Sequence, residues 1–348
     1  MREGWEIKRV KEICDKASSN IAQKEIVGKT GDYPVYGASG YVQNVDFFHR
    51  DKPYIGIVKD GSGVGRVNTY PAKTSLLGTL QYIIPKDGYL LGYVAYLLKS
   101  LNLAKFATGA AIPHIYFKEY GECKVPVPPI AEQEKIVAEL DCLTGIIEKK
   151  KQQLEELDKL AQSIFYDMFG DPITNEKGWE TKEIGQFCLL KSGKGIKATE
   201  LTSLPEEGRY ACYGGNGIRG YIAKYSHKGC YPIIGRQGAL CGNVVLAEGT
   251  FYATEHAVVV SPLQDNVNPL WLYFTLKLLN LNRFAQGVAQ PGLAVGALNK
   301  VEMIVAPLDL QNAFAQKIEA IEKQKELIKK SIQETETLFN SRMDYWFN

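Results

Sequence analysis

The sequence predicts a mixed α and β protein with two similar globular parts and two long helices. One observation is an internal repeat, because the second half of the chain restates the first at an offset of 174 to 178 residues. The others are Gly-rich stretches with strand-like runs and two apolar heptad patterns. Such a repeat predicts approximate two-fold symmetry, which suits a target with two half-sites. The matched pairs include Gly4 and Gly178, Trp5 and Trp179, Gly61 and Gly238, Gly65 and Gly242, Pro129 and Pro307, and Gln133 and Gln311.

The globular parts, residues 1–128 and 170–306, contain short apolar or β-branched runs between Gly, Pro and Asn residues. YIGIV and LQYII in the first part, and YPIIG and HAVVVSP in the second, are typical of strands. One helix is expected late in each part, at YLLGYVAYLLKSLN and NPLWLYFTLKLLN. We therefore expect two α/β domains with small twisted sheets. GDPITNEKG is expected to be a turn-rich hinge before the second domain.

A long helix is expected after each domain, over residues 129–169 and 307–348, because apolar residues recur at alternating steps of three and four. The two helices are predicted to pair antiparallel as a coiled coil. At about 1.5 Å per residue they would span roughly 55 to 60 Å and act as a spacer between the domains. The expected contact positions are Ile136, Leu140, Leu143, Ile147, Leu154, Leu157 and Ile164 in the first helix, and Phe314, Ile318, Ile321, Ile328, Ile332 and Phe339 in the second.

Composition places the chain among ordinary soluble proteins, with 45% apolar and 23% charged residues over 348 positions. We expect no membrane segment, because no apolar run is long enough to span a bilayer and the start MREGWEIKRV lacks a signal-peptide core. Seven cysteines without a C-x-x-C pair argue against a disulfide framework or structural zinc. The expected compartment is the reducing cytoplasm.

Charge is unevenly distributed along the chain. Residues 1–129 carry 17 Lys and Arg against 12 Asp and Glu, and residues 170–307 carry 13 against 11. The helical segments 130–169 and 308–348 are anionic, with 5 against 9 and 6 against 7. This division suits a polyanion bound by the domains and a protein bound by the helices, although an ordinary solvated surface could produce it too.

Catalytic motifs are not evident. An amino-methyltransferase motif needs an Asp or Asn before two prolines and an aromatic residue, and neither Asp171-Pro172-Ile173 nor Asn268-Pro269-Leu270 satisfies it. Gly28-Lys29-Thr30 imitates the end of a phosphate-binding loop but lacks its first glycine. The four histidines lack metal-ligand spacing. We therefore predict no catalytic residue, no metal site and no cofactor on this chain.

Two Gly-rich loops are the leading candidates for a DNA interface, because they combine closely approachable backbone with cationic and amide side chains. They are KDGSGVGR at 59–66 and RQGALCGN at 236–243, which share glycines but differ in polar residues. Each side chain could equally be a solvated turn residue. The candidate DNA-binding residues are Lys59, Ser62, Arg66 and His114 in the first domain, and Lys191, Lys194, Lys197, Asn216, Arg219, Arg236, Gln237, Asn243 and Gln290 in the second.

Two passages and their second-copy counterparts carry a family likeness. They are PPIAEQEKIVAELD at the start of the first long helix and MFGDP…N…GWE at its end, repeated as PLDLQNAFAQKI and GWETKEI. With the duplicated Gly-rich domains, this arrangement resembles the specificity subunit of Type I restriction-modification systems, over nearly the whole chain. The resemblance implies two target recognition domains, each reading one half of a bipartite DNA sequence, and a helix pair that fixes the gap.

The resemblance also implies partners. The helix pair would dock two methyltransferase subunits, and restriction subunits would join through the complex. S-adenosylmethionine, ATP and magnesium would bind those partners and not this chain. Two alternatives remain open from the residues alone. One is a coiled-coil scaffold whose globular parts bind proteins or sugars, and the other is a nucleotide-dependent enzyme that uses Gly28 to Thr30.

Overall fold

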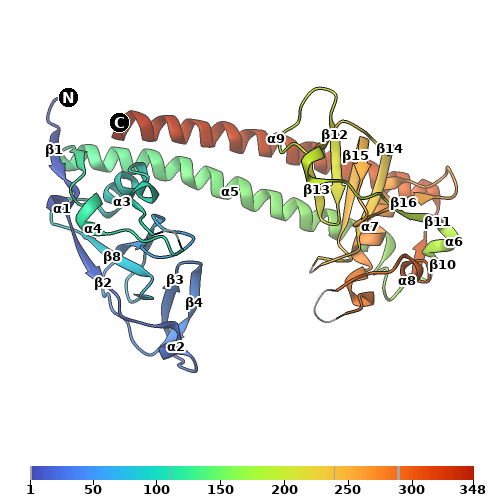
Figure 1. Cartoon of the computed structure of the whole chain (residues 1–348), viewed down its shortest axis with the longest axis horizontal. Helices are drawn as coiled ribbons and strands as arrows, with labels where there is room; N and C mark the ends of the chain where they lie inside the picture. Colours follow the sequence, from blue (N-terminus) through green and yellow to red (C-terminus); the bar gives the residue numbers. More distant parts are fainter. Residues whose placement is uncertain (1, 110, 239, 288–290) are drawn as a thin grey trace. The chain divides into compact units, whose positions relative to one another are not determined.

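The computed structural model describes residues 2–109, 111–238, 240–287 and 291–348 (Figure 1). It divides into two compact units. The first unit comprises Met1–Lys151 with Lys330–Asn348, and the second comprises Gln152–Lys329. Within the described ranges, no helix has the length and apolar character needed to cross a membrane.

The first unit holds three antiparallel or mixed sheets. A two-stranded ribbon joins the ends of the globular part, and a four-stranded sheet in the order β2-β8-β5-β6 lies beside a three-stranded one in the order β4-β3-β7. The strands are β1 (Glu6–Arg9), β2 (Cys14–Ser18), β3 (Tyr33–Gly37), β4 (Gly40–Val45), β5 (Tyr54–Val58), β6 (Val67–Tyr70), β7 (Ser75–Leu76), β8 (Leu80–Pro85) and β9 (Lys124–Val127). The helices are α1 (Val10–Ile13), α2 (Gln23–Ile26), α3 (Leu91–Ser100), η1 (Leu103–Phe106) and α4 (Phe117–Tyr120).

The second unit repeats the ribbon, as β10 with β17, but has one six-stranded sheet in the order β11-β16-β14-β15-β12-β13. Its strands are β10 (Glu180–Glu183), β11 (Cys188–Ser192), β12 (Tyr210–Gly214), β13 (Gly217–Ile222), β14 (His227–Gly235), β15 (Val244–Ala253), β16 (Ala257–Pro262) and β17 (Glu302–Val305). Its helices are α6 (Ile184–Phe187), η2 (Ala198–Glu200), α7 (Pro269–Leu278), η3 (Leu281–Phe284) and α8 (Val295–Leu298).

The two units differ in their sheets because one strand is continuous in the second and broken in the first. The ten-residue strand β15 pairs with β14 and, in parallel, with β12. At the matching positions of the first unit, Pro71 follows β6 and Lys73 has a positive φ of 57°. Proline has no N–H to donate to a ladder, and a non-glycine residue at positive φ leaves the extended conformation. The strand therefore splits into β6 and β7.

Each unit has its own core beneath the late helix that the sequence predicted. In the first unit, α3 buries Tyr93 and Val94 against β5, whose five residues are all buried. In the second unit, α7 begins at the cap Asn268, whose side chain accepts hydrogen bonds from the N–H groups of Leu270 and Trp271. Trp271 is fully buried. The predicted mixed α and β class, with one helix late in each part, is confirmed.

The long helices are α5 (Ile130–Phe169) and α9 (Leu308–Phe347), and they pack antiparallel in each unit (Figure 1). In the first unit, Glu139 of α5 accepts hydrogen bonds from Arg342 and Trp346 of α9, at 3.0 and 2.9 Å. In the second unit, the ring centroids of Phe165 and Phe314 lie 5.6 Å apart. Residues near the start of α5 thus contact residues near the end of α9, and residues near the end of α5 contact residues near the start of α9.

The heptad positions of both helices are buried or half-buried, including the two that carry lysine. Lys150 donates to the hydroxyl groups of Ser331 and Thr335 in the first unit. Lys325 lies 2.7 Å from Asp158 and 2.8 Å from Glu322 in the second. Each lysine therefore has acceptors within the helix pair, which offsets the cost of placing a charge there.

Gly145→Ala is expected to stabilise the first unit by about 0.5–1 kcal/mol, because glycine in a helix interior costs about that much relative to alanine. A Cβ atom at Gly145 would meet no atom within 4 Å. Gly92→Ala in α3 is the contrasting variant, because its Cβ would lie 2.9 Å from Val137 of α5. Urea denaturation followed by circular dichroism should show opposite shifts for the two variants. A shift in the same direction would contradict this reading of the helix packing.

Candidate nucleic-acid interface

The first Gly-rich loop, residues 59–66, connects β5 to β6 and is held by backbone hydrogen bonds at both ends. The N–H of Gly65 donates to Val58, the N–H of Gly61 donates to Pro113, and the N–H of Ile115 donates to Lys59, at 2.8, 2.9 and 3.0 Å. Gly65 has a φ of 87°, and a Cβ there would lie 2.5 Å from the backbone N of Ala104. Only glycine fits such a position without strain.

The second Gly-rich loop, residues 236–243, connects β14 to β15 and is held in the same way. The N–H of Gly242 donates to Gly235, the N–H of Gly238 donates to Pro291, and the N–H of Leu293 donates to Arg236, at 2.7, 3.0 and 2.8 Å. Gly238 and Gly242 have φ values of 87° and 88°. The two loops therefore share these backbone contacts, and they differ in the side chains that the loops carry. Ala239 of the second loop lies outside the described residues.

In the first loop, the structure gathers Lys59 and His114 around Asp60. Lys59 Nζ lies 3.9 Å from Asp60 Oδ2, and His114 Nδ1 contacts Asp60 Oδ1. The ring of His114 also packs on Tyr116, with centroids 4.2 Å apart. Asp60 is thus a negative group at the base of the loop, which the sequence analysis did not single out. It offsets part of the positive charge contributed by Lys59.

Arg66 turns back onto the neighbouring hairpin. Its Nη2 donates to the carbonyl of Ala38 at 2.9 Å, and its Nε donates to Gly63 at 3.3 Å. These bonds connect the first loop to the β3–β4 turn and leave other guanidinium donors available. Ser62 is exposed at the loop tip.

In the second loop, Arg236 and Asn243 contact residues from other segments. Arg236 Nη1 lies 3.3 Å from Ser192 Oγ at the end of β11, and Asn243 Nδ2 donates to Asn216 Oδ1 at 2.8 Å. Arg219 on β13 lies over Gly214, because a Cβ there would be 2.5 Å from its Cδ. Gln237 is exposed, and Gln290 lies outside the described residues.

A polar cluster beside Arg236 was missed by the sequence analysis. It comprises Thr254, Glu255 and His256, in the connection between β15 and β16. The N–H of Arg236 donates to the carbonyl of His256 at 3.1 Å, and His256 Nε2 lies 3.2 Å from Glu255 Oε1. Buried atoms of Arg236, Thr254, Glu255 and His256 have no hydrogen-bond partner among the described residues. A comparison of the two copies could have pointed to this cluster, because the matching residues of the first copy are Leu77, Gly78 and Thr79, which carry no charge.

The three candidate DNA-binding lysines of the second domain lie at the end of β11 and in the segment that follows it. Lys191, Lys194 and Lys197 are exposed, and none forms an ion pair within the described part of the chain. The segment packs on the β15–β16 connection, where the N–H of Lys194 donates to Ala253 at 3.2 Å. Burial, with a contribution from the charge of Lys191, lowers the pKa of His227. Lysines without carboxylate partners can neutralise phosphates.

The nucleotide-binding alternative finds little support in the local geometry. Gly28, at a φ of 80°, follows the four-residue helix α2, whereas a phosphate-binding loop precedes a longer helix. Lys29 Nζ lies 5.0 Å from the ring centroid of Phe47. Among the described residues, no group of three or more His, Cys, Asp and Glu side chains could hold a metal ion.

Two curated proteins illustrate the chain's relationships. It is 38% identical over 190 residues to the Type I restriction enzyme EcoprrI specificity subunit of Escherichia coli, covering 53% of this chain and 47% of that protein. It is 24% identical over 235 residues to the MjaIX specificity subunit of Methanocaldococcus jannaschii, covering 57% and 54%. The chain thus spans about half the length of these relatives.

Two solved structures share the fold. The S subunit of a Type I restriction-modification system from M. genitalium aligns with a TM-score of 0.65 at 18% identity, over 99% of this chain and 96% of that one. A chain from a study of complex assembly and conformational transition of the type I R-M system aligns with a TM-score of 0.56 at 14% identity, over 99% and 97%. A family model described as Type I restriction modification DNA specificity domain matches residues 2–159 and 176–337. The chain therefore belongs to the Type I restriction-modification DNA specificity family.

Proposed function

We propose that this chain is the DNA sequence-specificity subunit of a Type I restriction-modification complex. Residues 1–128 and 170–306 each read one half of a bipartite duplex target. The observation that carries the proposal is the pair of Gly-rich loops, whose backbones are anchored alike while their side chains differ. A shared scaffold with different tips is what two readers of different half-sites require, because base edges are distinguished by side-chain donors and acceptors.

In this proposal the segments 129–169 and 307–348 set the gap between half-sites and dock two methyltransferase subunits. Restriction subunits join through the complex. The chain itself is non-catalytic, and S-adenosylmethionine, ATP and magnesium bind the partner subunits. Action on genomic DNA would place the complex in the cytoplasm. The helix pair supports the spacer role, because its lysine contacts specify which residues of α5 and α9 meet.

The proposal is tested by changing the two loops separately. The triple variant Arg236→Ala, Gln237→Ala and Asn243→Ala is expected to alter recognition of one half-site, because each lost base contact costs about 1–3 kcal/mol of discrimination. The double variant Lys59→Ala and Ser62→Ala is expected to affect the other half-site. Methylome sequencing of a host that carries each variant with its methyltransferase reads both halves at once.

The reciprocal design is its own control, because each variant leaves one loop intact. The second half-site should remain unchanged in the Lys59 variant, and the first should remain unchanged in the Arg236 variant. If either variant altered both halves, or if neither altered any, the assignment of one half-site to each domain would be wrong.

A further inference from the structure

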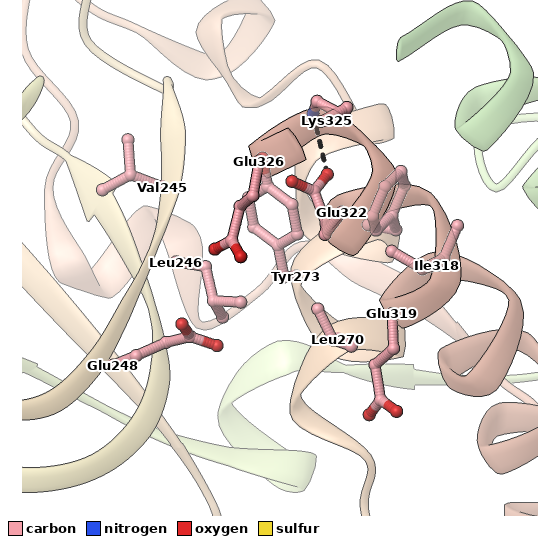
Figure 2. Close-up of a pocket in the computed structure, with 11 residues that line it drawn as sticks. Val245, Leu246, Glu248, Leu270, Tyr273, Ile318, Glu319, Glu322, Lys325 and Glu326 are labelled. Atoms are coloured by element: carbon pink, nitrogen blue, oxygen red, sulfur yellow. Dashed lines mark hydrogen bonds and ion pairs between the residues drawn. The ribbon is translucent and has the colours of Figure 1, made fainter. Parts of the chain in front are cut away.

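A groove in the second unit lies between the strand β15, the helix α7 and the amino-terminal half of α9 (Figure 2). Its volume is about 380 Å³. The apolar part of its lining includes Leu246 of β15, Leu270 and Tyr273 of α7, and Ile318 of α9. None of the residues of the Gly-rich loops lines this groove, so the proposed recognition of bases by those loops assigns it no role.

Four carboxylates surround this apolar lining. Glu248 projects from β15, while Glu319, Glu322 and Glu326 project from α9, and Figure 2 shows Glu248 and Glu326 pointing into the space between strand and helix. Glu322 pairs with Lys325. The other three glutamates form no ion pair within the described ranges. The groove therefore carries a negative charge that the described part of the chain does not neutralise.

The cation in the lining is already engaged. Lys325 contacts both Asp158 and Glu322. Burial lowers the pKa of Lys325, but the hydrogen bonds to these carboxylates outweigh burial and raise it, so the ammonium stays charged. A nearby cation, Lys277 of α7, lies 3.2 Å from the hydroxyl of Tyr273. Three exposed glutamates beside half-buried Leu246, Leu270 and Tyr273 remain available.

The groove depends on features that the second copy does not share with the first. The unbroken β15 carries Glu248 where the first copy has Pro71. On α7, Leu270 and Tyr273 stand where α3 has Gly92 and Ala95. The matching surface of the first unit therefore lacks both the unbroken strand and the side chains. An occupant of this groove would bind the second unit and not its counterpart.

We propose that this acidic groove binds a basic segment of a partner protein, in which an apolar side chain lies between lysine or arginine residues. The apolar side chain would contact Leu246, Leu270 and Tyr273, and the cations would face Glu248, Glu319 and Glu326. Complementary charge directs such an encounter, and the partly apolar lining adds burial. Nucleic acid does not fit, because its phosphates would face these carboxylates. The proposal is independent of how the loops read DNA.

The test uses the full chain and a fluorescein-labelled synthetic peptide with a leucine and a phenylalanine between two pairs of arginines. Anisotropy titration should show that Glu248→Gln with Glu326→Gln weakens binding by about tenfold or more, which corresponds to about 1.4 kcal/mol. Leu246→Ser should also weaken binding, with thermal melting used to check that the variant is folded. The same peptide with citrulline in place of arginine should bind weakly to every variant.

The matched control is Glu155→Gln with Glu207→Gln, because both residues are exposed carboxylates of the second unit outside the groove. This pair changes the net charge equally and should leave peptide binding unchanged. An equal loss in both pairs, or tight binding of the citrulline peptide, would overturn the proposal. Binding of a labelled DNA duplex should be the same for the groove variant and the wild type. A loss there would assign the groove to the DNA interface and overturn the proposal as well.

Discussion

Replacing Lys191, Lys194 and Lys197 together by alanine is expected to make DNA binding weaker and less dependent on salt. Each lysine that neutralises a phosphate contributes about 0.9 to the slope of log affinity against log salt concentration, so the triple variant should lose about 2.7 from that slope. Between about 50 and 200 mM salt, the wild type should therefore lose about 40-fold more affinity than the variant. All three side chains are exposed and unpaired within the described residues, so they are available to phosphates.

The measurement is a titration of a labelled duplex at several salt concentrations, with the chain in complex with its methyltransferase. The matched control is Lys135→Ala, Lys149→Ala and Lys159→Ala, because these lysines are also exposed and lie on the acidic helix α5. The control triple should leave the slope unchanged. Equal slopes for the two triples would mean that the segment after β11 contributes general charge and does not contact the backbone of DNA.

Phe165→Ala is expected to destabilise the second unit by about 3–5 kcal/mol, the usual cost of removing a fully buried phenylalanine side chain. Phe165 is 0% exposed. Its ring centroid lies 5.1 Å from that of Phe169, 6.4 Å from that of Phe274 and 5.6 Å from that of Phe314. The side chain thus connects α5, α7 and α9, and its loss would leave a cavity where three helices meet.

Denaturant unfolding followed by circular dichroism measures this effect, because the unfolding transition of the second unit should move to a lower denaturant concentration. Leu160→Ala is the control, because Leu160 lies on the same helix but is 47% exposed. Its cost should stay within about 0.5 kcal/mol, as for most surface substitutions. A comparable cost for both variants would show that α5 is not anchored in the core of the second unit.

The sequence predicted the long helices almost to the residue. A proline directly precedes each helix, and a heptad pattern continues for 40 residues in α5 and in α9. It also predicted the main strands at YIGIV and HAVVVSP. The β1–β9 and β10–β17 ribbons were not predicted. Their partners lie far apart in the chain, and local periodicity carries no information about such pairing.

The same limit applies to the candidate interface. Glycine positions in the loops follow from the repeat, and their backbone bonds match in the structure. The partners of the side chains do not follow, because they depend on segments that close over the loop. Arg66 bonds to the Ala38 carbonyl, and Asp60 contacts both Lys59 and His114. A residue-by-residue comparison of the two copies around Thr254 would have pointed to the polar cluster that the sequence analysis missed.

Lys150 of the first helix shows how the two copies of the repeat differ where the long helices meet. Lys150 is satisfied by Ser331 and Thr335 of α9. If two copies of the first half associated with each other, the matching positions would be Gln153 and Leu157, and leucine offers no acceptor. An ammonium group placed against leucine is penalised. The two halves are thus matched to each other at this position, because the second copy supplies two hydroxyl acceptors to Lys150 where the first copy would supply only the amide oxygen of Gln153.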